Sequence, residues 1–418
     1  MNKTLHTLIF ILAIGLSSVL GQSKEYTTDT LSMYPGYSND IYYSMSEGEV
    51  ANIPRAGWDI AFFTAPFSAG IIINEGNGVG LYSYPNGDTS SWAHVDTSGM
   101  SSWTPLYNSP EYWEDGAFNK NATGHPDYGW GIYNMVTHSV TGDSVYIINL
   151  PGEGIKKLWI VSKISVENTY NIKYANLDGS NEHIVAIDIK PYVSKNFIYY
   201  SLTNNSIVDR EPTASWDIMF TKYIDFTETM SGEMTEYLVT GATSNVDHFA
   251  SKFYPVPEDF EDWASKPLDS LKNTIGYNWK SFDMSTFQWI VEDSTVFFVK
   301  SKEGDIYKLV FTYWQGASTG VFALNKKLVS LLDIDNINEG NTMFALYPNP
   351  ASQNININID NQSSFKGNVI ITDLSGRTVY SSLLNNNNII NVSDFSKGLF
   401  FVTIYNDTFK ETQKLIIK

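Results

Sequence analysis

The middle of this chain contains an internal sequence repeat, and this repeat restricts the possible folds more than any other feature. Five blocks recur in the same order, at an offset of 157–158 residues for the first two and 149–151 for the last three. The first copy carries them at 42–45, 57–62, 130, 145–148 and 154–158, and the second at 199–202, 215–220, 279, 296–299 and 304–309. Each copy is long enough to be a domain, so the repeat predicts a tandem pair of similar domains.

The two ends of the chain predict further segments around this pair. A weakly basic start, the apolar run 7–20 and small residues at its end are typical of a secretory signal peptide at 1–21. The run is shorter than the roughly 20 apolar residues of a spanning helix, so we expect no transmembrane anchor. The expected domains are then 23–193 and 194–332, followed by a linker at 333–343 and a C-terminal domain at 344–418.

The local patterns favour strands throughout. Aromatic residues make up 14% of the chain and predict an all-β fold. Apolar runs around Gly-containing turns predict a hairpin at 144–161 and another at 294–313, whereas 326–332 is the best short helical candidate. Asn and Ile alternate at 354–360, which predicts a small Ig-like β-sandwich in the C-terminal domain.

The Trp-Asp-Ile blocks at 58–60 and 216–218 are shared by both copies, which favours a structural role over a functional one. We expect Asp59 and Asp217 to accept hydrogen bonds from buried backbone N–H groups or from the indole N–H. Function should therefore lie where the copies differ, chiefly at 74–138 in the first copy.

Composition excludes several classes of function. The net charge of −18 disfavours nucleic acid as a partner, and the absence of cysteine excludes disulfides and thiolate chemistry. Ser318 stands in a Gly-x-Ser-x-Gly pattern, but no histidine follows His248, so we expect no hydrolase and no enzyme. The acidic stretch 333–340 lacks the glycine and glutamate positions of an EF-hand and is expected to be a solvated linker.

Separate motifs near the C-terminus occur in a recognisable order. They are Phe-Ala-Leu-Tyr-Pro-Asn-Pro-Ala from 344, Ile-Thr-Asp-Leu-Ser-Gly-Arg from 371, Lys-Gly-Leu-Phe-Phe-Val-Thr-Ile from 397 and a terminal Lys-Leu-Ile-Ile-Lys. This series resembles the type A sorting domain of the type IX secretion system. The resemblance implies export to the outer surface of a gram-negative bacterium or beyond, with the secretion machinery as partner.

The repeated blocks also resemble a family. Trp-Asp-Ile-Ala-Phe from 58, Asn-Glu-Gly-Asn-Gly-Val-Gly from 74, the Tyr-Tyr-Ser lead-in and the late hairpin resemble the HmuY-like surface and secreted haem-binding proteins. The second copy lacks the Gly-rich segment. The resemblance implies an all-β fold and haem held between two axial side chains, with haem or a haem-carrying protein as partner.

Haem ligands in proteins are His, Met, Cys or Tyr, and cysteine is absent here. The first copy offers the candidate ligands His94, His125, His138, Met100 and Met135. The second copy offers His248, Met230 and Met234. The first copy is thus the expected haem site, with His94, His125, His138 and Met135 as its ligands. The alternative function is a structural or adhesive surface protein that binds no haem.

Overall fold

The computed structural model describes residues 25–229, 231–330, 344–359, 367–373, 377–384, 388–406 and 410–418. The chain divides into two compact units, residues 1–332 and 333–418. The expected signal peptide at 1–21 and the linker at 333–343 lie outside the described residues. Strands joined by turns and short 3₁₀ helices make up the described parts, which confirms the all-β class.

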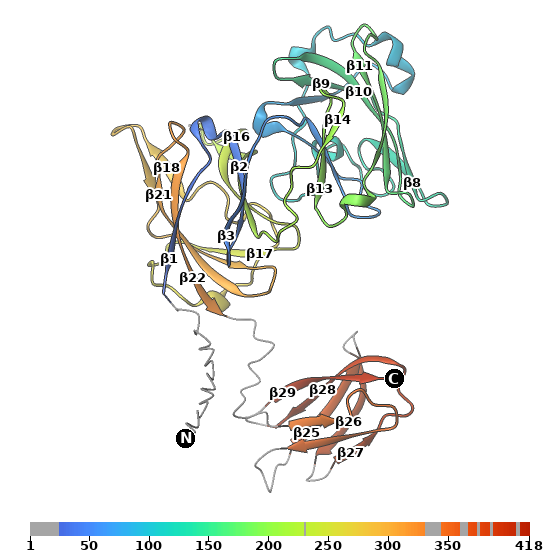
Figure 1. Ribbon diagram of the computed structural model, residues 1–418, viewed down its shortest axis with the longest axis vertical. Coiled ribbons are helices and arrows are strands. Elements are labelled where there is room, and N and C mark those ends of the chain that lie inside the picture. The colour runs from blue at the N-terminus through green and yellow to red at the C-terminus, as the bar shows by residue number, and fades with distance from the viewer. Residues whose placement is uncertain are drawn as a thin grey trace, which may run out of the picture. The chain divides into compact units, whose positions relative to one another are not determined.

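Residues 57–208 form a first lobe, a sandwich of two antiparallel sheets (Figure 1). The smaller sheet has the order β14-β13-β4-β5. The larger runs β12-β11-β10-β8-β7, with β9 pairing both β10 and β6. The strands are β4 (Ile60–Phe63), β5 (Ile71–Ile73), β6 (Gly80–Ser83), β7 (Gly131–Asn134), β8 (Ser139–Gly142), β9 (Tyr146–Leu150), β10 (Gly154–Ile164), β11 (Thr169–Asn176), β12 (His183–Asp188), β13 (Phe197–Ser201) and β14 (Ser206–Val208). The 3₁₀ helices are η2 (Glu75–Asn77), η3 (Thr89–His94), η4 (Met100–Ser102), η5 (Ala117–Asn119) and η6 (Lys190–Tyr192).

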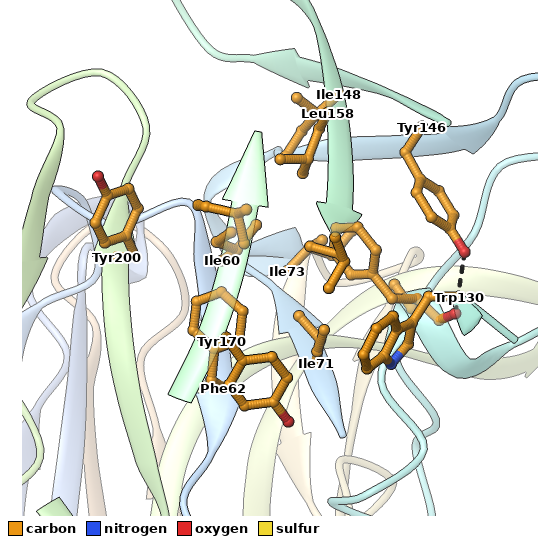
Figure 2. Close-up of a cluster of buried hydrophobic side chains, with 14 of the residues drawn as sticks. Ile60, Phe62, Ile71, Ile73, Trp130, Tyr146, Ile148, Leu158, Tyr170 and Tyr200 are labelled. Atoms are coloured by element: carbon orange, nitrogen blue, oxygen red, sulfur yellow. Dashed lines mark hydrogen bonds between the residues drawn. The ribbon is translucent and has the colours of Figure 1, made fainter. Parts of the chain in front are cut away.

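Apolar and aromatic side chains fill the space between the two sheets of the first lobe (Figure 2). Phe62 of β4 packs against Tyr170 of β11, with ring centroids 4.6 Å apart. Trp130 is fully buried, and its Nε1 donates to the carbonyl of Ala69 at 2.9 Å. Burial of these aromatic rings removes large apolar areas from water and accounts for much of the lobe's stability.

Residues 25–54 and 216–330 together form a second lobe, again with two antiparallel sheets (Figure 1). One sheet has the order β16-β15-β2-β3 and the other β1-β22-β21-β20-β17, while β18 and β19 form a separate hairpin. The strands are β1 (Thr27–Ser32), β2 (Asn39–Ser44), β3 (Gly48–Pro54), β15 (Ile218–Glu228), β16 (Met234–Ser244), β17 (Phe249–Phe253), β18 (Lys280–Asp283), β19 (Gln288–Val291), β20 (Val296–Lys300), β21 (Ile306–Trp314) and β22 (Val321–Ser330). The 3₁₀ helices are η1 (Pro35–Tyr37) and η7 (Trp263–Ser265).

The expected domain boundary between residues 193 and 194 does not separate the two lobes. The order β14-β13-β4-β5 in the first lobe corresponds to β3-β2-β15-β16 in the second, and β12-β11-β10-β9-β6 corresponds to β1-β22-β21-β20-β17. Two strands of the second copy, β13 and β14, therefore complete the first lobe, whereas β1, β2 and β3 of the first copy complete the second lobe. As a result the first lobe is one continuous segment, inserted between the two parts of the second.

The two repeated aspartates stabilise this exchange, as the sequence predicts. Asp59 Oδ2 accepts from the backbone N–H of Leu202 at 2.7 Å, and Asp217 Oδ2 accepts from that of Met45 at 2.6 Å. Asp217 also accepts from the N–H of Lys302 at 2.9 Å. Each aspartate of one copy thus holds the opening strand of the other, which confirms the expected structural role.

Two short connections, 55–56 and 209–215, join the lobes, and Asp40 of β2 binds an arginine from each. Asp40 Oδ1 lies 2.7 Å from Arg55 Nη2 and Oδ2 lies 2.9 Å from Arg210 Nη2. Thr221 Oγ1 donates a further hydrogen bond to Asp40 at 2.7 Å. These partners hold the pKa of Asp40 below its usual value even though burial acts to raise it. One buried, fully paired carboxylate therefore links the two connections.

Glu75 of η2 should make the stability of the two-lobe unit fall as pH rises from about 4.5 to about 7. Burial raises the pKa of Glu75 from 4.5 to about 7, against hydrogen bonds from the N–H groups of Ile224 and Asn108 and the charge of Lys272. A carboxyl group with a raised folded pKa binds more protons folded than unfolded. Its stabilisation is therefore complete below pH 4.5 and lost as pH rises through 7.

Urea unfolding at pH 5 and pH 7.5 measures this effect. Glu75→Gln should reduce the loss of unfolding free energy between the two pH values. Part of the loss should remain, because burial also raises the pKa of Asp59 and Glu211. Glu236→Gln, at an exposed glutamate paired with Lys120 at 3.8 Å, is the control. The same pH dependence in Glu75→Gln and wild type would rule out the assignment.

The C-terminal unit is a small sandwich with sheet orders β23-β24-β27 and β26-β25-β28-β29. Its strands are β23 (Phe344–Tyr347), β24 (Asn354–Ile359), β25 (Gly367–Asp373), β26 (Thr378–Leu384), β27 (Asn388–Asn391), β28 (Gly398–Tyr405) and β29 (Lys410–Ile417). Ile355, Val369 and Val402 belong to a core that draws on both sheets. The Asn-Ile alternation at 354–359 thus forms a half-buried strand, as expected. In the part of the chain that the structure describes, no helix has the length and apolar character needed to cross a membrane.

Candidate functional site

The β7–β8 hairpin at one edge of the first lobe carries two of the expected haem ligands, Met135 and His138, in its turn. Asn134 shapes this turn, since its Oδ1 accepts from the N–H groups of Val136 at 2.8 Å and Thr137 at 3.1 Å. His138 adopts a left-handed conformation with a φ of 54°. The Asn134 side chain therefore fixes the backbone of the turn by accepting these hydrogen bonds, and the residues of the turn are exposed.

Tyr133 of β7 brings His125 and His138 into one cluster. The Tyr133 ring lies 5.4 Å from the ring of His125, and its hydroxyl lies 2.7 Å from His138 Nδ1. If Nδ1–H donates to the tyrosine oxygen, the lone pair of His138 Nε2 is free to bind a metal. Two of the three predicted histidines thus share a neighbourhood, 13 residues apart in the chain.

Exposed apolar side chains surround this histidine cluster. Met135 is 73% exposed in the hairpin turn, and Val136 and Ile132 are exposed beside it. Phe67 lies with its ring 6.5 Å from that of His138. An apolar patch of this kind on a monomeric protein is typical of a binding surface.

A hollow of about 310 Å³ adjoins the cluster, lined by residues that include Phe67, Tyr128 and Asp127. The Tyr128 ring lies 6.2 Å from that of Tyr133, which connects the hollow to the histidines. Lys163 is buried and donates to the carbonyl of Ser68, which fixes the loop carrying Phe67. Burial lowers the pKa of Lys163 to about 8.

His94 is not part of this cluster. It ends η3 and is exposed, and the backbone carbonyl of Trp92, two residues earlier, accepts a hydrogen bond from Lys157 Nζ at 2.8 Å. Lys157 lies in the half of β10 that pairs with β9, whereas β8 pairs with β10 at Ser162–Ile164. At about 3.3 Å per residue, these two parts of β10 are roughly 20 Å apart. The sequence could not show this separation, because it depends on which strands pair.

His248, the only histidine of the second copy, is unavailable as a ligand. It is buried, its Nε2 lies 3.1 Å from Asp217 Oδ1 and its Nδ1 lies 2.9 Å from the carbonyl of Val246. Met234 is exposed on β16, and Met230 lies outside the described residues. The second lobe therefore offers no exposed histidine among its described residues.

The sequence interpretation missed a second exposed hairpin, formed by β18 and β19. At the repeat offset of 149 residues, Met284 corresponds to Met135 and Phe287 corresponds to His138. Met284 is 68% exposed, and Phe287 has the same φ of 54° as His138. The hairpin shape and the exposed methionine are common to both lobes, while the histidine is present only in the first. Extending the repeat alignment into the unshared stretch would have revealed this pair.

Among the described residues, no group of three or more His, Cys, Asp or Glu side chains could hold a bare metal ion. Haem needs fewer protein ligands than a bare metal ion, because the porphyrin supplies four ligands and the protein supplies one or two. A pair of exposed imidazoles beside an apolar patch could supply these ligands.

Two parts of the chain match known families. Residues 345–418 match the secretion system C-terminal sorting domain, and residues 193–323 match the HmuY protein family. The sorting-domain match supports the expectation of export. The HmuY match covers the second copy, whose opening strands β13 and β14 complete the first lobe.

The remaining comparisons add little. No curated protein matches the chain. The dimeric latent PorU of Porphyromonas gingivalis aligns at 11% identity over 94% of this chain and 34% of its own, with a TM-score of 0.15. The BSP domain of a biofilm-associated protein aligns at 8% identity over 94% and 81%, with a TM-score of 0.16. These scores are too low to indicate a common fold. By the family matches, residues 193–323 are similar to HmuY proteins and residues 345–418 to C-terminal domains that direct proteins to a secretion system.

Proposed function

We propose that this protein captures haem outside the cell, at the β7–β8 hairpin of the first lobe. The observation that carries the proposal is the cluster of His125 and His138 around Tyr133 on an exposed apolar edge. The sorting-domain match supports the location, and the HmuY match at 193–323, which does not include the hairpin itself, supports the ligand class. The two matches leave open which side chains would hold haem, and the hairpin geometry supplies the candidates.

His138 would be the first ligand, because the Tyr133 hydroxyl lies 2.7 Å from its Nδ1 and would leave Nε2 available when Nδ1 carries the proton. His125 or Met135 would be the second ligand. The ring of His125 lies beside that of Tyr133, and Met135 lies in the same turn as His138. When bound, haem would supply an iron that accepts these nitrogen or sulfur atoms. Phe67, Ile132 and Val136 would cover the apolar porphyrin faces. Because Glu114, Asp115 and Asp127 line the hollow, the ligand's own carboxylates should face solvent.

Titration of the full-length protein with haem tests the proposal. We expect a shifted Soret band in the wild type and at least a tenfold weaker affinity in His138→Ala and in His125→Ala. Tyr133→Phe should weaken binding by about tenfold, because it removes the hydrogen bond that orients the ligand. His94→Ala and His183→Ala are matched controls in the same lobe, and both should bind as the wild type does. An unchanged Soret shift in the His125→Ala/His138→Ala double variant would refute the site.

The alternative function, a structural or adhesive surface protein, draws support from the second lobe. Its β18–β19 hairpin exposes Met284, Phe287 and Trp289 without a histidine, which suits contact with another apolar surface. The same titration separates the two functions, because an adhesive protein would give no saturable Soret shift at all.

A further inference from the structure

A small cavity lies at the junction of the two lobes and is lined by residues of both. Its volume is about 60 Å³. Trp58, Glu75 and Trp113 line it from the first lobe, and Asp40 and Lys272 line it from the second. Arg210, in one of the two connections, also lines it. Room of this size holds a few waters or one small inorganic ion and excludes a larger organic ligand.

The charges around the cavity do not balance. Four cationic side chains line it, those of Arg55, Arg210, Lys222 and Lys272, against the two carboxylates of Asp40 and Glu75. Asp40 is already paired with both arginines. The oxygens of Glu75 accept from the backbone N–H groups of Asn108 at 3.0 Å and Ile224 at 2.9 Å. Within this lining, cationic side chains therefore outnumber carboxylates by two.

Lys272 is the clearest part of this surplus. No carboxylate lies within ion-pair distance of its Nζ among the residues described, although the charges of Glu75, Asp225 and Asp115 act on it from farther away, and its ammonium group lies 4.7 Å from the Trp113 ring. Burial lowers the pKa of Lys272 to about 8, so the charged form predominates at neutral pH. A buried ammonium without an acceptor is costly, which implies that a partner enters from solution.

Two further side chains offer hydrogen-bond donors to the cavity. Trp58 Nε1 is buried and has no hydrogen-bond partner among the described residues. Arg210 donates to described residues through Nη2 alone, to Asp40 and to the carbonyl of Pro54. Trp58, Arg210 and Lys272 are only 6%, 8% and 5% exposed. Lys, Arg and the indole N–H donate and never accept, so a ligand that satisfies all three must be an acceptor.

We propose that this cavity binds a small inorganic anion, of the class of chloride or bromide, which joins the two lobes. The anion would accept from Trp58 and Lys272 and would balance the charge left at the two connections. Since the donors come from both lobes, binding favours the joined arrangement over any opening of the junction.

Bromide is a direct probe of the site. Crystals of the full-length protein in sodium bromide, measured at the bromine absorption edge, should give an anomalous peak inside the cavity beside Trp58, Arg210 and Lys272. A cavity that holds water alone at high bromide concentration would overturn the proposal.

Thermal unfolding in solution provides the second measurement. Sodium chloride should raise Tm relative to sodium gluconate at equal ionic strength, because gluconate is too large for the cavity. Trp58→Phe, which keeps an aromatic ring and removes the N–H, should need at least tenfold more chloride for half of the rise, and so should Lys272→Met. Trp314→Phe is the matched control, because Trp314 Nε1 is also buried without a partner but does not line this cavity. An equal chloride response in Trp58→Phe and Trp314→Phe would overturn the proposal even if Lys272→Met fails to fold.

Discussion

Replacing Asp40 with alanine should lower the free energy of unfolding of the two-lobe unit by about 3–5 kcal/mol. The carboxylate is 2% exposed and pairs with Arg55 and Arg210, so its removal leaves two guanidinium groups buried without their counterion. Asp40→Asn, which keeps the shape and removes the charge, should lose a large part of the same amount. Denaturant unfolding of the full-length protein, followed by tryptophan fluorescence, measures both changes.

Asp209→Ala is the matched control for Asp40. Asp209 lies beside Arg210 in the same connection and pairs with Lys195, but its side chain is 49% exposed. A solvent-exposed pair of this kind contributes about 1 kcal/mol or less. Equal losses in Asp40→Ala and Asp209→Ala would show that the buried cluster does not stabilise the junction.

The segment 57–208, expressed alone, should fold and unfold cooperatively. The core of the first lobe, from Ile60 to Leu202, lies entirely inside this segment. The shorter segment 57–193 lacks β13 and β14, and with them the fully or nearly fully buried side chains of Ile198, Tyr200 and Leu202. Losing one large core side chain costs about 2–5 kcal/mol, so losing three exceeds the margin of a typical domain.

Circular dichroism and thermal unfolding of the two segments measure this difference. We expect a sharp transition for 57–208 and none for 57–193. The longer segment should be less stable than the full protein, because it exposes Trp58 and Tyr199 at the former junction. Cooperative folding of 57–193 would mean that β13 is dispensable to the sheet and would contradict the observed pairing of Phe197–Tyr200 with β4.

The individual strands could be predicted because their signals are local. The hairpins expected at 144–161 and 294–313 appear as β9–β10 and β20–β21, and the Asn-Ile alternation expected to form a strand at 354–360 appears as β24. The helix expected at 326–332 was wrong over its described part. There β22 pairs with β21 from Lys326 to Ser330, and Lys326 also pairs with Thr27 of β1, so pairing within the sheet decides the conformation whatever the local preference.

The domain boundary could not be predicted, for a reason that lies in the repeat itself. Tyr42 in β2 and Tyr199 in β13 belong to matching blocks, so either strand would suit the place beside β4. The path of the two short connections between the lobes determines which of the two strands pairs with β4. Comparison of the repeated sequence blocks gives no information about that path. The hydroxyls of these two tyrosines lie 3.5 Å apart at the junction, which shows how closely the exchanged strands approach.

The candidate site was predictable in part. Residue type and the family resemblance pointed to the histidines of the first copy, and the structure groups His125 with His138. The organising residue, Tyr133, carried no signal, because tyrosine is common in this chain and its role depends on a contact in space. His94 was indistinguishable from the other two by sequence.

The pairing of Thr27 with Lys326 has a consequence for how the protein is made. The first lobe can form as soon as residue 208 has been synthesised, whereas β1–β3 must wait for strands that arrive more than a hundred residues later. Contacts this distant in the chain form late. The C-terminal sorting domain follows the last of these strands. A chain that ends before residue 330 and cannot close its second lobe therefore also lacks the segment that is similar to secretion sorting domains.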